Sequence, residues 1–181
     1  MWLIKIEDVT PTGKGFSKPY CYHIDQFESL RPVFMQVMKY ARAMGLDMIQ
    51  GDHEDAPGQL ELNWMYDDVL RNADRLSTYR QICAQVAREF NLIACFMTKP
   101  FMGVSASGCH TNMSLWTGGK DKVNKLSHKS IPAMDEVFTY VEGGKNTFMP
   151  DTKDVQLPGK VGLKAIGGVM KHLGALTAIG S

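Results

Sequence analysis

Residues 51–62 read GDHEDAPGQLEL, a turn signal placed between two runs of strand-like sequence. Pro57 and Gly58 favour a tight reversal of the chain in the middle of this stretch. Beyond the turn, residues alternate between two faces as far as residue 66, as they do in a strand with one buried face. The apolar face holds Leu60, Leu62, Trp64 and Tyr66, and the other face holds Glu61, Asn63 and Met65. The stretch therefore predicts two neighbouring strands joined by a turn.

Two carboxylates lie on either side of this turn. Glu54 precedes it and Glu61 follows it, so adjacent strands can bring the two side chains together. Two close carboxylates repel one another, which raises the pKa of one of them. A hard divalent cation such as Mg²⁺ or Mn²⁺ would relieve the repulsion, because it prefers oxygen ligands. The alternative is a pair of solvated acids beside a hairpin, and the spacing alone leaves both interpretations open.

Helical and strand patterns alternate along the rest of the chain. Apolar residues recur at helical spacing between Asp25, which can cap a helix, and Gly45, which can end it. A second helix is predicted after Asp67 or Asp68, with Asn91 at its end. Further strands are predicted over residues 2–6, 20–24, 46–51, 92–98 and 110–116. Because several of these strands have one polar face, we predict an α+β fold with helices packed on one side of the sheet.

Composition narrows the range of functions. The 181 residues are 44% hydrophobic and 22% charged, which suits about one globular domain. The net charge of +1 provides no field that would attract nucleic acid, and no apolar run reaches the ~18 residues of a membrane-spanning helix. The four cysteines form no C-x-x-C pair and indicate reduced thiols, so we expect a cytoplasmic protein that binds neither nucleic acid nor membranes.

A second polar face is predicted on the strand over residues 110–116. Alternation places His110, Asn112, Ser114 and Trp116 on one face. A histidine followed by hydrogen-bonding groups suits a metal ligand beside a polar ligand, whereas the alternative is an edge strand with one solvated face. The preceding small residues, 105–108, could let a ligand approach backbone N–H groups.

Three ordered motifs resemble the catalytic domain of glutamine synthetases. They are HEDAPGQLEL at 53–62, FMTKP at 96–100 and SGCHTNMSLW at 107–116, and the closing segment GGVMKHLGALTAI is similar too. The resemblance implies an α+β fold with a curved antiparallel sheet flanked by helices, and an active site shared between subunits of a homo-oligomeric ring. It also implies a carbon–nitrogen ligase, in which ATP phosphorylates the γ-carboxylate of glutamate and ammonia then displaces the phosphate, with Mg²⁺ or Mn²⁺ as the cofactor.

The resemblance also implies roles for individual residues. Glu54 and Glu61 correspond to ligands of the metal that orients glutamate, and His110 to a ligand of the metal that bridges the ATP phosphates. The residues expected at the ATP are Trp64, Tyr66, Asn112 and Ser114. The residues expected at the amino-acid substrate are Ser105, Ala106 and Gly108.

This sequence departs from the family pattern at several positions. Asn112 replaces the second histidine of a His-x-His pair, and Ser105 and Ala106 stand where the family usually has Asn-Gly. An additional stretch covers roughly residues 120–142. These departures do not specify which amine is the substrate, so a γ-glutamylamide ligase that uses methylamine or another amine is the alternative to a glutamine synthetase.

The resemblance covers an incomplete domain. Residues 1–181 correspond to a partial catalytic domain, without the family's N-terminal β-grasp domain, its Glu-x-Glu strand or its arginine-rich segment. We therefore expect the fragment alone to be inactive. An alternative of another class is a non-catalytic pseudo-enzyme or structural piece.

Overall fold

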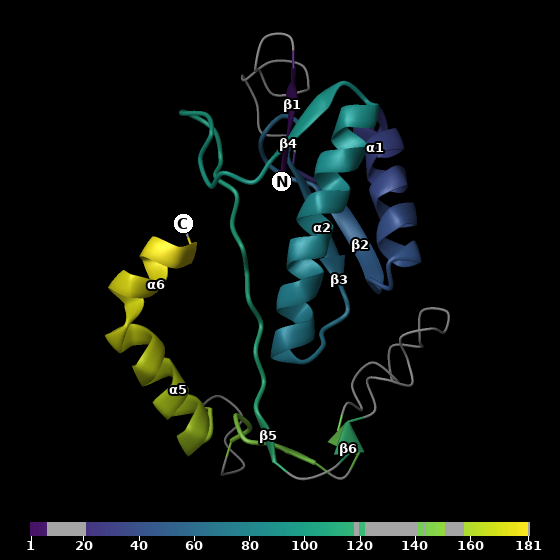
Figure 1. Cartoon of the computed structure of the whole chain (residues 1–181). Helices are drawn as coiled ribbons and strands as arrows, with labels where there is room; N and C mark the ends of the chain where they lie inside the picture. Colours follow the sequence, from purple (N-terminus) through teal and green to yellow (C-terminus); the bar gives the residue numbers. More distant parts are fainter. Residues whose placement is uncertain (7–20, 118–119, 122–140, 143, 151–157, 181) are drawn as a thin grey trace. The chain divides into compact units, whose positions relative to one another are not determined.

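The computed structural model describes residues 1–6, 21–117, 120–121, 141–142, 144–150 and 158–180 (Figure 1). The chain divides into two compact units, residues 1–107 and residues 108–181, and each is described by itself. Among the described residues, no helix is long and apolar enough to cross a membrane.

The first unit contains two antiparallel pairs of strands. In one pair, β1 (Trp2–Lys5) lies against β4 (Leu92–Cys95). In the other, β2 (Met48–His53) lies against β3 (Leu60–Trp64), and the turn predicted from Pro57 and Gly58 joins these two strands. The predicted strand at 20–24 is wrong, because residues 21–22 form a turn and the first helix begins at Ile24. The other predicted strands of this unit are confirmed with shifted bounds. β2 begins and ends two residues later than predicted, and β1, β3 and β4 end one, two and three residues earlier.

Backbone hydrogen bonds join the two pairs at the turn. The amide of Leu3 donates to the carbonyl of Gly58 at 2.8 Å, and the amide of Leu60 donates to the carbonyl of Met1 at 2.8 Å. Trp2 and Gln59 form an antiparallel bridge at the same place. β1 therefore lies beside the start of β3, and all these pairings are antiparallel, as predicted.

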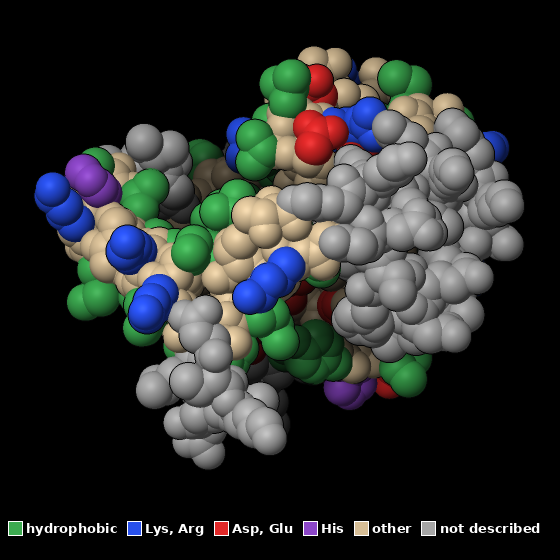
Figure 2. Space-filling view, turned by 90° about the horizontal axis from the view of Figure 1, so that it is seen from below, with side chains coloured by type: hydrophobic (Ala, Val, Ile, Leu, Met, Phe, Trp, Pro, Cys, Tyr) green, Lys and Arg blue, Asp and Glu red, His purple; other side chains and the backbone are tan. Residues whose placement is uncertain are grey.

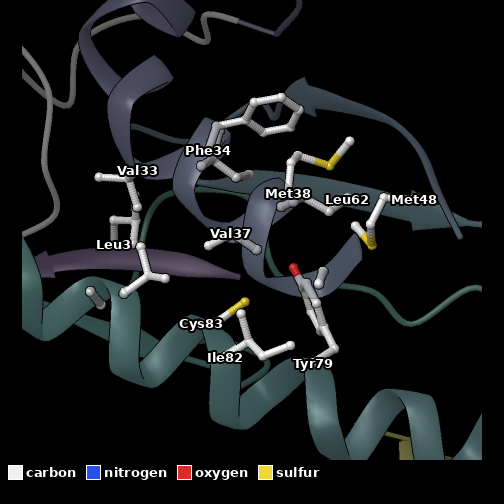
Figure 3. Packing of buried hydrophobic residues seen from close by; sticks show 14 of the residues in the cluster. Leu3, Val33, Phe34, Val37, Met38, Met48, Leu62, Tyr79, Ile82 and Cys83 are labelled. Atoms are coloured by element: carbon white, nitrogen blue, oxygen red, sulfur yellow. The ribbon is translucent and has the colours of Figure 1, made fainter. Parts of the chain in front are cut away.

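Two helices pack on the strands and on each other (Figure 1). These are α1 (Ile24–Ala43), which contacts β2, and α2 (Val69–Glu89), which contacts β4. Their apolar stripes meet alternate residues of the strands in one core (Figure 3). The core includes Leu3, Val33, Phe34, Val37, Met38, Met48, Leu62, Tyr79, Ile82 and Cys83.

The helix ends test the predicted stop and start signals. The side chain of Asp68 accepts a hydrogen bond from the amide of Arg71, so Asp68 caps α2. Gly45 and Asn91 follow the two helices with positive φ of 78° and 58°, as expected for residues that end a helix. The prediction for Asp25 is wrong, because α1 begins one residue earlier and Asp25 lies in its first turn, where a negative charge favours the helix dipole.

Short strands in the second unit share one register. β5 (Trp116–Thr117) pairs with β8 (Lys145–Asn146), and β6 (Lys120–Asp121) pairs with β7 (Val141–Glu142). Both pairs have the same antiparallel register: each step forward along the first strand is matched by one step back along its partner. The additional stretch at 120–142 therefore starts and ends at a paired stem, and its interior lies outside the described residues.

The C-terminal segment forms two consecutive helices. They are α5 (Lys160–Lys171) and α6 (Leu173–Gly180), separated at His172. Apolar residues recur at helical spacing along this segment, and it is helical despite its glycines. Lysine side chains lie exposed along α5, where the space-filling view shows a row of basic groups (Figure 2).

Candidate functional site

The predicted pair of carboxylates forms at the turn between β2 and β3. Leu60 and Leu62 are buried in the core, so Glu61 between them lies exposed on the opposite face of the strand. The strand partner of Glu61 is Asp52, and the amide of Glu54 donates to the carbonyl of Gln59 at 2.8 Å. The backbone therefore places Glu54 and Glu61 on the same face, close enough for their carboxyl groups to interact.

The environment of Glu54 favours its neutral form. Partial burial raises the pKa of Glu54 above its ordinary value of 4.5, and the hydrogen bond to Glu61 and repulsion between the two carboxyl groups raise it further. A hydrogen bond from the backbone of Asp55 opposes this rise. The pair thus carries the charge conflict that was predicted from the sequence.

The same turn holds the small-residue loop. The side-chain amide of Gln59 donates to the carbonyl of Ala106 at 3.1 Å and to Oγ of Ser107 at 3.1 Å. The hydroxyl of Ser105 donates to the carboxylate of Asp55. The structure therefore brings two of the predicted substrate residues, Ser105 and Ala106, to the turn that carries the carboxylates.

An apolar cluster supports this face of the sheet. Trp2, Ile4 and Ala56 are buried together, on the side of β1 opposite to Leu3. Phe101 packs edge-on against Trp2 with ring centroids 5.5 Å apart. The segment that leads to residue 105 is thus held against the sheet by apolar packing before it reaches the turn.

Gln59 and Asp55 contribute to the site, and the sequence reasoning did not assign them a role. Both lie within residues 51–62, where a glutamine directly after a Pro-Gly turn and before an apolar strand could have indicated a buried polar residue. Gln59 is nevertheless buried, which residue type alone does not suggest.

Trp64 and Tyr66 occupy different environments. The indole N–H of Trp64 donates to the side chain of Asn72 at 2.7 Å, and its ring packs on Tyr79 with centroids 5.3 Å apart. Tyr66 lies beyond the end of β3 and is 37% exposed. Trp64 therefore packs against α2, and a role of either residue at ATP stays a prediction.

The strand predicted over residues 110–116 is wrong. Only Trp116 and Thr117 of this region are in a strand, and residues 110–115 are exposed and irregular. Alternation predicts which residues would share a face, but a strand also requires a neighbour to pair with, and the described residues provide none for 110–114. The shared face of His110, Asn112 and Ser114 therefore does not form here.

The remaining predicted site residues belong to the second unit, whereas the carboxylates belong to the first. A Cβ on Gly108 would lie 3.5 Å from Nε2 of His110, so these two residues are close. Ser114 accepts a hydrogen bond from the indole of Trp116 at 3.0 Å. Asn112 is exposed. Their roles at ATP, metal or substrate stay predictions.

The donor set fits part of a divalent-cation site. Within the described ranges, no three His, Cys, Asp or Glu side chains form a group that could hold a metal ion. Glu54 and Glu61 nevertheless provide adjacent carboxylate oxygens, the ligand type that Mg²⁺ and Mn²⁺ prefer. The two residues therefore fit as a pair of ligands, with the rest of the coordination shell supplied by other groups or water.

The raised pKa of Glu54 predicts a pH dependence of stability. A carboxyl whose pKa is raised on folding contributes stability that is fully present below its unfolded pKa and is lost as pH rises through the folded pKa. Without divalent cations, Glu54→Gln should therefore gain stability relative to the wild type as pH rises from about 4.5 towards neutral. Urea denaturation of both proteins across this range measures the difference, and a pH-independent difference would contradict the prediction. Glu28→Gln, at an exposed residue of α1, is the control.

Comparisons with known proteins identify the family. Residues 4–144 match the family model described as glutamine synthetase, catalytic domain. The chain is 33% identical over 175 residues to a glutamine synthetase of Rhizobium meliloti (strain 1021), covering 97% of this chain and 34% of that protein. It is 34% identical over 132 residues to a glutamate–methylamine ligase of Methyloversatilis universalis, covering 73% of this chain and 30% of that protein.

A solved structure of the protein GmaS in complex with ADP resembles the fold. Its TM-score is 0.75 at 28% sequence identity, over 98% of this chain and 35% of that chain. The chain thus spans about a third of the length of the relatives that it matches. The motifs, the antiparallel strands with their helices and the family match agree, and the chain belongs to the glutamine synthetase family as part of the catalytic domain.

Proposed function

We propose that this chain carries part of the active site of a ligase that joins ammonia to the γ-carboxylate of glutamate at the expense of ATP. The observation that carries the proposal is the pair Glu54 and Glu61, whose carboxyl groups interact on one face of the sheet beside the loop at 105–107. The family match supports the reaction class.

The proposed reaction poses a problem of negative charge. The γ-carboxylate of glutamate attacks the terminal phosphorus of ATP, so an acyl phosphate forms and ADP leaves. The amine nitrogen then attacks the acyl carbon, phosphate leaves, and the amine loses a proton to give the amide. A divalent cation bound by Glu54 and Glu61 would neutralise the paired carboxylates and attract the substrate carboxylate.

The identity of the amine is the second part of the proposal. A relative is a glutamate–methylamine ligase, and the similar solved structure is GmaS. The loop residues Ser105 and Ala106, where the family usually has Asn-Gly, are the feature of this chain that favours a γ-glutamylamide ligase as the alternative. A pseudo-enzyme or structural piece is the alternative without catalysis.

Stabilisation by Mn²⁺ tests the metal pair in this chain, whether or not the fragment is active. At ten times the dissociation constant, binding to the native state adds about 1.4 kcal/mol of stability. For a chain of this size that corresponds to a rise in Tm of about 3–5 °C. We expect this rise for the wild type and its loss in Glu54→Gln and in Glu61→Gln, measured by near-UV circular dichroism with and without Mn²⁺.

Glu28→Gln is the matched control, because it removes an exposed carboxylate far along the sequence from the pair. This variant should keep the full Mn²⁺ effect. Equal Mn²⁺ effects in the wild type and both pair variants would show that Glu54 and Glu61 are not the ligands. No effect in any protein would favour the pseudo-enzyme or structural alternative.

An assay of the amine separates the two ligase reactions. We expect ATP-dependent phosphate release with glutamate to require an amine, and the comparison of ammonia with methylamine to decide which one is used. A preference of about tenfold for methylamine, or about 1.4 kcal/mol in transition-state stabilisation, would overturn the glutamine synthetase reaction in favour of the γ-glutamylamide ligase. The protein that contains this chain with its full catalytic domain is the sample for this assay.

A further inference from the structure

We propose that Gln59 is a positioning residue that fixes the loop at 105–107 in place beside the carboxylate pair. The inference rests on the proposed function, because that function makes this loop the substrate side of the site. It assigns to Gln59 no contact with substrate or metal. Its role is to set the spacing between two parts of the site that are far apart in the sequence.

The side chain of Gln59 is buried and its polar atoms have partners. It is 3% exposed, and its Nε2 donates at 3.1 Å both to the carbonyl of Ala106 and to Oγ of Ser107. Its Oε1 accepts from the amide of Ala56 at 3.3 Å. One side chain therefore joins the turn, through Ala56, to the loop, through Ala106 and Ser107.

The backbone of Gln59 holds the other half of the site. Its carbonyl accepts from the amide of Glu54 at 2.8 Å, and Glu61 follows two residues later on the same face of the strand. The bridge between Gln59 and Trp2 anchors this residue in the sheet. Since Gln59 contacts Glu54 through its main chain and the loop through its side chain, it fixes the positions of both relative to the sheet.

Among the residues that the structure describes, few other polar contacts hold the tip of the loop. The structure gives a hydrogen bond from the amide of Ser107 to the carbonyl of Thr98 at 2.7 Å and the contact of Ser105 with Asp55. Ala106 itself is exposed. The donor groups of Gln59 are therefore a large share of what holds residues 105–107 against the turn.

An amide is the side chain that suits this position, because it offers two N–H donors and an acceptor at once. Methionine has nearly the same size but no N–H donor, so Gln59→Met should release the loop without leaving a cavity.

Hydrogen exchange of the Ser107 amide measures the order of the loop, because this amide is hydrogen-bonded to the carbonyl of Thr98 in the same segment. Two lost hydrogen bonds of about 1 kcal/mol each correspond to about ten- to thirty-fold weaker protection. We expect this loss in Gln59→Ala. We expect the same loss in Gln59→Met, which keeps the volume of the side chain and removes its donors. Protection of Val86, in the core, should not change.

Gln50→Met is the matched control, because Gln50 is an exposed glutamine on the neighbouring strand. Its Ser107 protection should equal that of the wild type. Unchanged protection of Ser107 in Gln59→Ala would overturn the inference, as would an equal loss at Val86, which would mean general unfolding. Absence of Mn²⁺ stabilisation in the wild type would count against the proposed function, whereas the exchange result depends on Gln59 alone.

Discussion

Arg75→Ala is expected to lower the free energy of unfolding by about 3 kcal/mol, the low end of the cost of removing one partner from a buried ion pair. Arg75 is 7% exposed, and its guanidinium lies 3.0 Å from Asp67 and 3.3 Å from Asp47. It also donates to the carbonyl of Met65 at 3.3 Å. Its loss leaves the buried carboxylate of Asp67 with Arg71 at 3.3 Å and the backbone amide of Asp68 at 2.8 Å.

Urea denaturation of the wild type and Arg75→Ala measures this effect. A double variant, Arg75→Met with Asp67→Leu, removes both charges and should recover much of the lost stability, because buried apolar side chains carry no charge that needs a partner. Arg88→Ala, in the exposed last turn of α2, should change stability by less than about 0.5 kcal/mol. A loss below about 1 kcal/mol in Arg75→Ala would show that the network does not stabilise the fold.

The network has a consequence for the site. Arg75 joins α2 to residues 65–67, the segment directly after β3. Tyr66, which the family resemblance places at ATP, lies in this segment. We therefore expect Arg75→Ala to loosen the predicted nucleotide side of the site while the pair Glu54 and Glu61, held by the β2–β3 turn, keeps its Mn²⁺ effect.

Gly51→Ala is expected to lower the free energy of unfolding by about 2–3 kcal/mol, because the added methyl group overpacks the core. A Cβ at this position would overlap the ring of Phe34 in α1 and would lie 2.9 Å from the backbone carbonyl of Glu61. The ring can move only into a packed core, and the carbonyl cannot move without the strand. Gly51 is thus a glycine that allows the close approach of α1 to β2.

Thermal and urea denaturation of Gly51→Ala should show the loss of stability. A double variant, Gly51→Ala with Phe34→Leu, tests whether the clash with Phe34 is its cause. Phe34→Leu alone removes core volume and destabilises, but in the double variant the freed space should absorb part of the new methyl group, so the losses are less than additive. Gly167→Ala, in α5 with open space around it, should be neutral or slightly stabilising. Strictly additive losses would mean that contact with Phe34 is not the cause.

Local signals predicted much of the first unit. The Pro-Gly turn, the stripes of the two helices and the alternation after the turn correspond to β2, β3, α1 and α2. These features depend on neighbours within a few residues, so a linear pattern is enough to detect them. The convergence of Glu54 and Glu61 followed from the same logic, because a turn between paired strands leaves little freedom in which residues face each other.

Other features depend on which segment arrives from elsewhere in the chain. Residues 110–114 alternate like a strand, yet they lack a paired neighbour in the part that the structure describes. The apolar pattern placed Trp64 on the buried face, but only packing shows that its indole is engaged by Asn72 and Tyr79. Pairing and burial are relations between two segments, and one segment alone does not specify them.

The sequence by itself determined the turn, the helices, the pair of carboxylates and the family, because each rests on a short local pattern or an ordered set of motifs. Only the tertiary structure decided that Gln59 is buried and that it ties the loop at 105–107 to the turn. The reason is physical: the partners of Gln59 lie 47 and 48 residues away, and only the folded sheet brings them within hydrogen-bonding distance.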